Sequence, residues 1–143
     1  MYRKTHGELQ FLLVHPGGPF WKAKDRGAWT IPKGEIQVGE APLLAARREF
    51  EEELGFQPQG NFIPLTPVKQ KGGKLVHAWA FEGDCDLTSC QSNTFSLEWP
   101  PRSGKFQQFP EVDRFAFFNL ELAGEKINPA QRPFLSELQR LLS

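Results

Sequence analysis

The stretch Gly34 to Phe56, GEIQVGEAPLLAARREFEEELGF, decides the fold of this chain. We expect a helix from Pro42 to Leu54, because a rotation of about 100° per residue gathers an apolar stripe formed by Leu43, Ala46, Phe50 and Leu54. Pro42 suits the first turn of a helix, where its missing N–H is no loss, and Gly55 suits the left-handed residue that follows one. The pattern therefore predicts the helix and both of its ends.

Three acidic side chains share a neighbouring face of this helix. Glu49, Glu52 and Glu53 stand at spacing i, i+3, i+4, so their carboxylates converge within about one turn. Like charges this close repel, and a hard divalent cation with oxygen ligands is the natural compensation. Arg48 can reach Glu52 at i+4 and orient a carboxylate without taking a coordination position. The alternative is a solvated acidic face on an amphipathic helix.

A loop from Ile31 to Ala41 leads into the helix, and Gly34 and Gly39 let its backbone approach a ligand closely. Loop and helix together resemble the complete signature of the Nudix hydrolases, with no position departing from it. The matching elements, in chain order, are Gly34, Glu40, Arg48-Glu49-Phe50, Glu52-Glu53 and Gly55-Phe56.

The resemblance implies a fold and a reaction. The fold is an α/β/α sandwich with a mixed β-sheet between helices. The reaction is hydrolysis of a phosphoanhydride in a nucleoside diphosphate linked to a further group, with Mg²⁺ or Mn²⁺ as cofactor. Carboxylates that hold such metals, which neutralise phosphate oxygens and activate water, agree with that chemistry.

The resemblance also implies roles for single residues. Glu52 and Glu53 are metal ligands, and Glu49 is a third ligand or the group that takes a proton from water. Arg48 orients these glutamates. Glu40 stabilises the structure of the loop and helix or joins an outer metal shell.

Two further metal contacts follow from the same resemblance. The backbone carbonyl of Lys33, just before the first glycine of the signature, helps to bind metal. In related sequences an acidic residue a few positions before a later strand often adds a carboxylate, and Glu111 occupies the comparable place, with Glu98 and Glu82 as rivals.

Candidate substrate-binding residues lie outside the signature. The segment HPGGPFWKAKDRGAW, residues 15 to 29, places Trp21 beside Lys22, Lys24 and Arg26. Bases stack on aromatic rings and phosphates pair with cations, so we expect this loop to bind a nucleotide. The alternative for each residue taken singly is packing for the tryptophan and solvation for the cations.

Three more positions are candidates for substrate contact. The Lys33 side chain faces a phosphate or, alternatively, the solvent. His77 is a pocket residue or a hydrogen-bonded core histidine. Arg102, in the polar segment of residues 100 to 113, binds phosphate or belongs to a connection without a role.

The rest of the chain supplies the elements of one sandwich. We expect strands at residues 2–5, 8–15, 62–70, 74–81, 94–99 and 115–119, and helices at residues 120–126 and near 129–142. Gly72-Gly73 signals a two-residue hairpin turn, and Pro64 and Pro67 place their strand at a sheet edge. With 143 residues and no long linker, residues 1–143 are predicted to form a single domain.

Composition narrows the partners. Lys plus Arg and Asp plus Glu both total 17, so the formal net charge is zero and a nucleic-acid polymer is not an expected partner. The expected partner is a small nucleotide. The polar N-terminus and the lack of a long apolar run predict a cytoplasmic protein that does not engage a membrane. Cys85 and Cys90 are expected to be reduced and incidental. The sequence leaves the oligomeric state open.

The substrate is the least determined feature. The proline that marks ADP-ribose hydrolases beyond the signature is absent, because Lys71 and Gly72 occupy that neighbourhood. The sequence WTIPKGE, residues 29–35, and the spacing from Glu111 to Phe117 look somewhat like the bis(5′-nucleosyl)-tetraphosphatase branch. Dinucleoside polyphosphates or nucleoside triphosphates are therefore the expected substrates. A Nudix-fold domain that binds or senses a nucleotide without turnover is the alternative.

Overall fold

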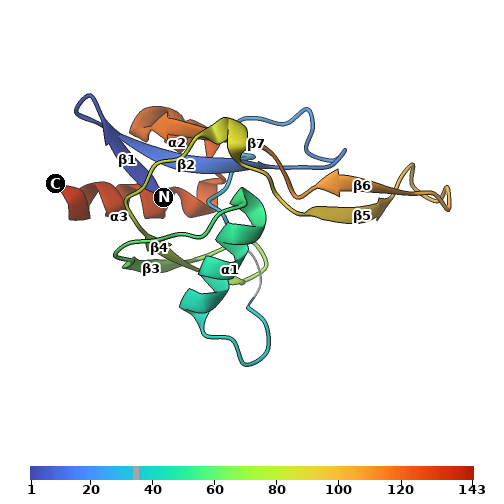
Figure 1. The fold of residues 1–143 in the computed structure, drawn as a ribbon, viewed down its shortest axis with the longest axis horizontal. Coiled ribbons are helices and arrows are strands. Elements are labelled where there is room, and N and C mark those ends of the chain that lie inside the picture. Colours follow the sequence, from blue (N-terminus) through green and yellow to red (C-terminus); the bar gives the residue numbers. More distant parts are fainter. Residues whose placement is uncertain (34–35) are drawn as a thin grey trace.

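The computed structural model describes residues 1–33 and 36–143, so Gly34 and Glu35 lie outside the described residues. Its strands are β1 (Tyr2–Thr5), β2 (Glu8–Pro16), β3 (Ile63–Lys69), β4 (Leu75–Ala80), β5 (Thr94–Glu98), β6 (Phe106–Pro110) and β7 (Val112–Asn119). Its α-helices are α1 (Pro42–Leu54), α2 (Leu120–Lys126) and α3 (Arg132–Leu142), and two short 3₁₀ turns are η1 (Leu87–Ser89) and η2 (Pro129–Gln131). Figure 1 shows their arrangement.

Strand β2 is the centre of the main sheet, which has the order β1-β2-β7 with antiparallel neighbours. Parallel bridges from Tyr2 to Glu82 and from Trp29 to Ile127 add the other sense of pairing. The described strands β3 and β4, and β5 and β6, form separate antiparallel pairs. The described part of the chain therefore combines both senses of strand pairing.

Alternate residues of β2 face two different helical layers. Leu12 and Val14 belong to a core cluster with Phe50 and Leu54 of α1. Phe11 and Leu13 belong to a second cluster, together with Ala123 of α2 and Leu135 and Leu138 of α3. Because successive side chains of a strand point to opposite faces, α1 covers one face and the two later helices cover the other. This is the expected layering of helix, sheet and helix.

Helix α1 begins and ends where the sequence predicts. Ala41 is its N-cap, Pro42 opens the first turn, and Gly55 ends the helix with φ 88° and an N–H donated to Glu51 O at 2.8 Å. The predicted apolar stripe is only partly buried. Phe50 and Leu54 are buried, whereas Leu43 and Ala46 are half-buried and line a cavity of about 90 Å³ between α1, β4 and α3.

Two connections differ from expectation. The β3–β4 turn comprises Lys71, Gly72 and Gly73, because Gln70 N–H donates to Lys74 O at 2.8 Å; it is one residue longer than predicted. Both glycines have positive φ, as expected. The segment of residues 100 to 113 contains strand β6, which sequence reasoning missed. Its residues pair with β5 to form an antiparallel hairpin that projects from the body of the molecule (Figure 1).

The C-terminal part follows the sequence closely. Helix α2 has the predicted bounds, and Asn128 caps η2 by accepting from Ala130 N at 3.0 Å. The regular helix α3 starts later, at Arg132, which places Pro133 in its first turn, where the missing N–H costs little. None of the helices in the described residues is long and apolar enough to cross a membrane.

Candidate active site

Arg48 joins the loop ahead of α1 to the acidic face of the helix. Its guanidinium donates to both carboxylate oxygens of Glu40, at 2.8 and 3.0 Å, and to Glu49 Oε1 at 2.7 Å. It also donates to Glu52 Oε1 at 3.2 Å, the i+4 contact that the spacing predicts. Hydrogen bonds from Arg48 hold the pKa of the Glu40 carboxyl below its ordinary value. Two elements of the signature are thereby fixed relative to one another.

Glu53 is the buried member of the acidic group, with 9% of its surface exposed. Its Oε2 accepts the backbone N–H of Lys33 at 2.7 Å. Burial, followed by the negative charges of Glu49 and Glu111, raises the pKa of Glu53 to about 8, although the hydrogen bond from Lys33 opposes this rise. A buried carboxylate with so little positive charge nearby is stabilised either by taking up a proton or by binding a cation.

Glu111 lies beside the same group although it comes from a distant part of the chain. Burial and the charge of Glu52 raise the pKa of Glu111, and burial raises that of Glu49 despite its contact with Arg48. Glu98, one rival for the fourth carboxylate, instead accepts the Arg102 N–H at 2.9 Å in the projecting hairpin. Glu82, the other rival, forms a bridge with Tyr2, which pairs with Phe11 near the middle of β2. Glu111 therefore lies close enough to α1 for the charge of Glu52 to raise its pKa.

The donor set suits a hard divalent cation. Glu49, Glu52, Glu53 and Glu111 offer carboxylate oxygens. Burial, together with the charges of Glu49 and Glu111, makes a nearby cation favourable for Glu53. Within residues 1–33 and 36–143, no three acidic, histidine or cysteine side chains are gathered at metal-ligand spacing. One oxygen of each of Glu49 and Glu52, Oε1, accepts a hydrogen bond from Arg48. The carbonyl of Lys33 adjoins Gly34, which lies outside the described residues.

A groove of about 550 Å³ opens beside the N-terminal half of α1. Its lining includes the predicted substrate residues Lys33 and His77, and His77 is an exposed residue of β4. Ala45 and Ala46 form its helical wall. Because the Lys33 N–H donates to Glu53, the groove adjoins the acidic group. We define this space as the groove.

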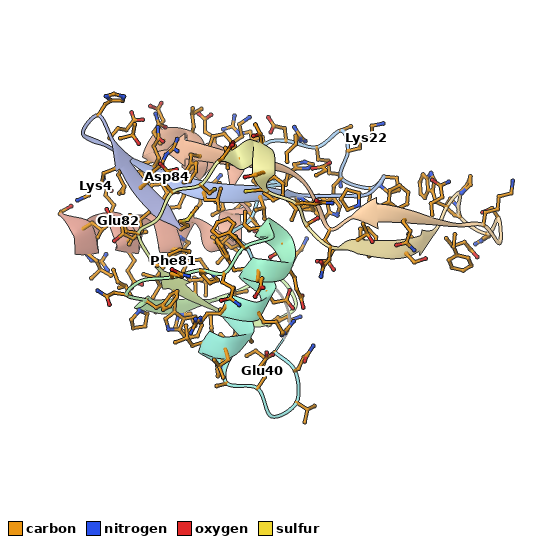
Figure 2. The ribbon with its side chains drawn as sticks, in the orientation of Figure 1. Lys4, Lys22, Glu40, Phe81, Glu82 and Asp84 are labelled. Atoms are coloured by element: carbon orange, nitrogen blue, oxygen red, sulfur yellow. The ribbon has the colours of Figure 1, made fainter. Side chains whose placement is uncertain are left out.

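The predicted nucleotide loop is exposed. Trp21, Lys22, Lys24 and Arg26 all face solvent, and the Lys24 ammonium lies 5.0 Å from the centroid of the Trp21 ring. Figure 2 shows Lys22 on the outer side of this loop, well away from Glu40 at the start of α1. Arg102 lies in the turn at the far end of the projecting hairpin, so the structure does not bring it to the acidic group.

His15 is a residue that sequence reasoning passed over. Its side chain is fully buried at the end of β2, with Nδ1 at 2.7 Å from Asp113 Oδ1 and Nε2 at 2.6 Å from Lys24 O. It therefore links the nucleotide loop to β7, two residues after Glu111. A histidine that directly follows the apolar run FLLV was the available signal.

Comparison with known proteins agrees with the signature. A family model described as NUDIX domain matches residues 2–138, and the chain belongs to this family. An RNA pyrophosphohydrolase of Francisella tularensis subsp. mediasiatica (strain FSC147) is 44% identical over 49 residues, which are 34% of this chain and 32% of that protein. The match thus spans about a third of the length of the curated relative.

Solved structures share the fold. The Ap4A hydrolase of C. elegans, crystallised as a binary complex, superposes with a TM-score of 0.66 at 23% identity and covers 99% of this chain and 92% of that one. The NUDIX domain of Shewanella oneidensis NrtR, complexed with ADP ribose, has a TM-score of 0.66 at 15% identity and covers 99% and 83%. The predicted α/β/α sandwich is confirmed.

Proposed function

We propose that residues 1–143 form one catalytic domain that hydrolyses a phosphoanhydride bond in a nucleotide. The observation that carries this proposal is the burial of Glu53 beside Glu49 and Glu111, at a pKa of about 8. A fold has no structural need for a buried, uncompensated carboxylate, since such a group destabilises it. Membership of the NUDIX family and the printed activities of the similar proteins support the same reaction class.

The proposed cofactor is Mg²⁺ or Mn²⁺, held by Glu49, Glu52, Glu53, Glu111 and the Lys33 carbonyl. When bound, the metal would neutralise phosphate oxygens and favour ionisation of water. The chain itself contributes proton transfer and orientation. Glu49 is proposed either as a third metal ligand or as the group that accepts a proton from the attacking water. Arg48 is held by its hydrogen bonds to Glu40 and orients Glu49 and Glu52 by donating to both.

The substrate residues remain those of the loop and the groove. Trp21, Lys22, Lys24 and Arg26 are proposed to contact base and phosphates, and Lys33 and His77 to line the path to Glu53. Arg102 is proposed as an outer phosphate contact. The expected substrates are dinucleoside polyphosphates or nucleoside triphosphates, in line with the Ap4A hydrolase that shares the fold.

The deciding experiment measures phosphate and pyrophosphate release with Mg²⁺ and with Mn²⁺. The panel contains nucleoside triphosphates, dinucleoside polyphosphates, ADP-ribose, nucleotide sugars and a 5′-triphosphorylated RNA. Glu53→Gln is the blank, because it removes a charge at nearly constant volume. We expect turnover of one class by the wild type and a loss of about a hundredfold or more in the folded variant. Equal turnover by both proteins would refute the proposed site, whereas ligand binding without turnover would favour the nucleotide sensor.

A further inference from the structure

The hairpin of β5 and β6 projects as an arm, which we define as residues 94–110 (Figure 1). Its paired residues run from Thr94↔Pro110 to Glu98↔Phe106, a length of about 14 Å. Among the described strands, β5 and β6 pair only with each other. The arm is therefore held through its base and through side chains on its faces.

The base of the arm is attached to the acidic end of α1. Asn93 N–H donates to Glu52 O at 2.8 Å, and Gln91 N–H donates to Leu54 O at 3.2 Å. On the returning strand, Glu111 N–H donates to Asn93 O at 2.8 Å. The arm thus starts and ends beside the carboxylates to which we assign the chemistry.

One aromatic side chain of the nucleotide loop, that of Phe20, lies against one face of the arm, and Trp21 follows it in the chain. The rings of Phe20 and Trp99 meet edge to face, with centroids 5.5 Å apart, although Phe20 stays 60% exposed. Trp21 is 39% exposed and lies under the Lys24 ammonium. We define Phe20, Trp21 and Trp99 as the aromatic site. Exposed rings beside a cation are suited to stacking with a nucleobase next to a phosphate.

The aromatic site lies within reach of the carboxylates. Gly17 N–H donates to Glu111 O at 2.9 Å. Trp21 follows Gly17 by four residues, so the backbones of Gly17 and Trp21 are at most about 14 Å apart. The groove lies at the other end of the acidic face, because Pro42 and Ala45 line it. At 1.5 Å per residue, Ala45 and Glu52 are about 10 Å apart along α1. The carboxylates therefore stand between the groove and the aromatic site.

We propose that the aromatic site binds the second nucleoside of a substrate that carries a nucleoside at each end of a polyphosphate chain. The first nucleoside then occupies the groove, and the polyphosphate crosses the acidic face of α1. This inference rests on the proposed function and selects among its substrates. A long single-stranded nucleic acid fits less well, because the chain has a formal net charge of zero.

The test compares diadenosine tetraphosphate with ATP as substrates of Phe20→Ala. Losing one stacked base costs about fivefold to a hundredfold in affinity. We expect the KM for diadenosine tetraphosphate to rise by that factor, whereas kcat for both substrates and KM for ATP change less than about twofold. Phe106→Ala is the matched control, since Phe106 is a 68% exposed ring on the opposite face of the arm and should leave all four constants unchanged.

Calorimetric titration of both ligands into metal-free protein supplies a second readout that does not need turnover. Wild-type protein should bind diadenosine tetraphosphate more tightly than ATP, and Phe20→Ala should remove the difference. Equal affinities in the wild type, or equal effects of Phe20→Ala and Phe106→Ala, would overturn the inference while leaving the proposed reaction standing. A larger loss on a 5′-triphosphorylated oligonucleotide than on diadenosine tetraphosphate would overturn the assigned occupant. Failure of the proposed function would show separately, as absence of turnover across the whole panel.

Discussion

Glu53 combines burial with a proposed chemical role, and its protonation should govern the pH dependence of stability. In metal-free protein its pKa of about 8 exceeds the value of about 4.3 for an unfolded chain. Between these values the folded state binds more protons than the unfolded state, so the free energy of unfolding decreases as the pH rises. Below about pH 4 both states are protonated at Glu53 and the effect vanishes.

Glu53→Gln should therefore flatten this dependence. In the presence of EDTA we expect the variant to be more stable than the wild type at pH 8.5, by on the order of a few kcal/mol, and equally stable near pH 4. Thermal unfolding of both proteins across this range measures the difference. Parallel curves would mean that Glu53 is not the buried, uncompensated group described above.

The proposed role of Arg48 in orienting the glutamates depends on the shape of its guanidinium as much as on its charge. Its planar guanidinium holds Glu40 through two hydrogen bonds while reaching Glu49, which a lysine ammonium cannot reproduce. We predict that Arg48→Lys lowers turnover or metal affinity by about tenfold to a hundredfold. The control is Arg47→Lys, because Arg47 lines the apolar cavity on another face of α1. An unchanged kcat/KM at saturating Mg²⁺ would contradict an orienting role for Arg48.

The grouping of the α1 glutamates could be predicted from the sequence, because the spacing of residues in a helix determines which side chains share a face. Glu49, Glu52 and Glu53 needed only the 3.6-residue period to be placed together. The hydrogen bond between the Lys33 amide and Glu53 could not be predicted from the sequence, since that contact depends on how the preceding loop folds back on the helix. His15 was missed for the same reason, because its partner Asp113 is distant in the chain.

At the scale of elements, Gly17, which follows β2, packs closely against the arm. A Cβ added to Gly17 would lie 1.9 Å from Pro110 O, so no side chain fits without moving β6. Gly17→Ala should lower the free energy of unfolding by about 1–3 kcal/mol and reduce turnover, because Glu111 follows Pro110 directly. Thermal unfolding and initial rates measure the two effects.

Gly124→Ala provides the comparison for that experiment. Gly124 lies in α2, where an added Cβ would meet nothing within 4 Å. Alanine favours a helix over glycine, so we expect this variant to gain up to about 1 kcal/mol with unchanged turnover. If both substitutions acted alike, close packing at Gly17 would not explain the result.

Strands and helices were predicted well where the sequence pattern was long and local. The bounds of α1 and α2 follow from capping residues and spacing, whereas β6 was missed because its residues, FQQFP, alternate weakly and contain a proline. Its identity as a strand depends on pairing with β5, which the segment itself does not reveal. Non-local pairing is the information that a single sequence lacks.

At the scale of the whole molecule, metal binding should appear as added stability. A ligand that binds only the folded state at a hundred times its Kd adds about 2.7 kcal/mol. For a chain of this size, that corresponds to an increase in Tm of about 5–10 °C. We expect this increase with Mg²⁺ or Mn²⁺ at pH 8, and a much smaller one in Glu53→Gln. A Tm that does not change when either ion is added would contradict the proposed metal site.

The layering of the whole molecule was accessible from sequence because β2 alternates between two helical faces. The relative position of the groove and the arm was not accessible, because the two are built from segments on either side of α1 that meet only after folding. The expected substrate class therefore had to rest on resemblance.

The attachment of the arm has a consequence for how specificity can change. Its backbone ties lie at Gln91, Asn93 and Glu111, whereas the seven residues of the turn, 99 to 105, lie at the far end. Substitutions and insertions in that turn leave the hydrogen bonds around Glu52 and Glu111 untouched. On the proposed assignment, the chemistry and the choice of ligand are thus separable, and new specificities can be selected in the turn without rebuilding the proposed catalytic site.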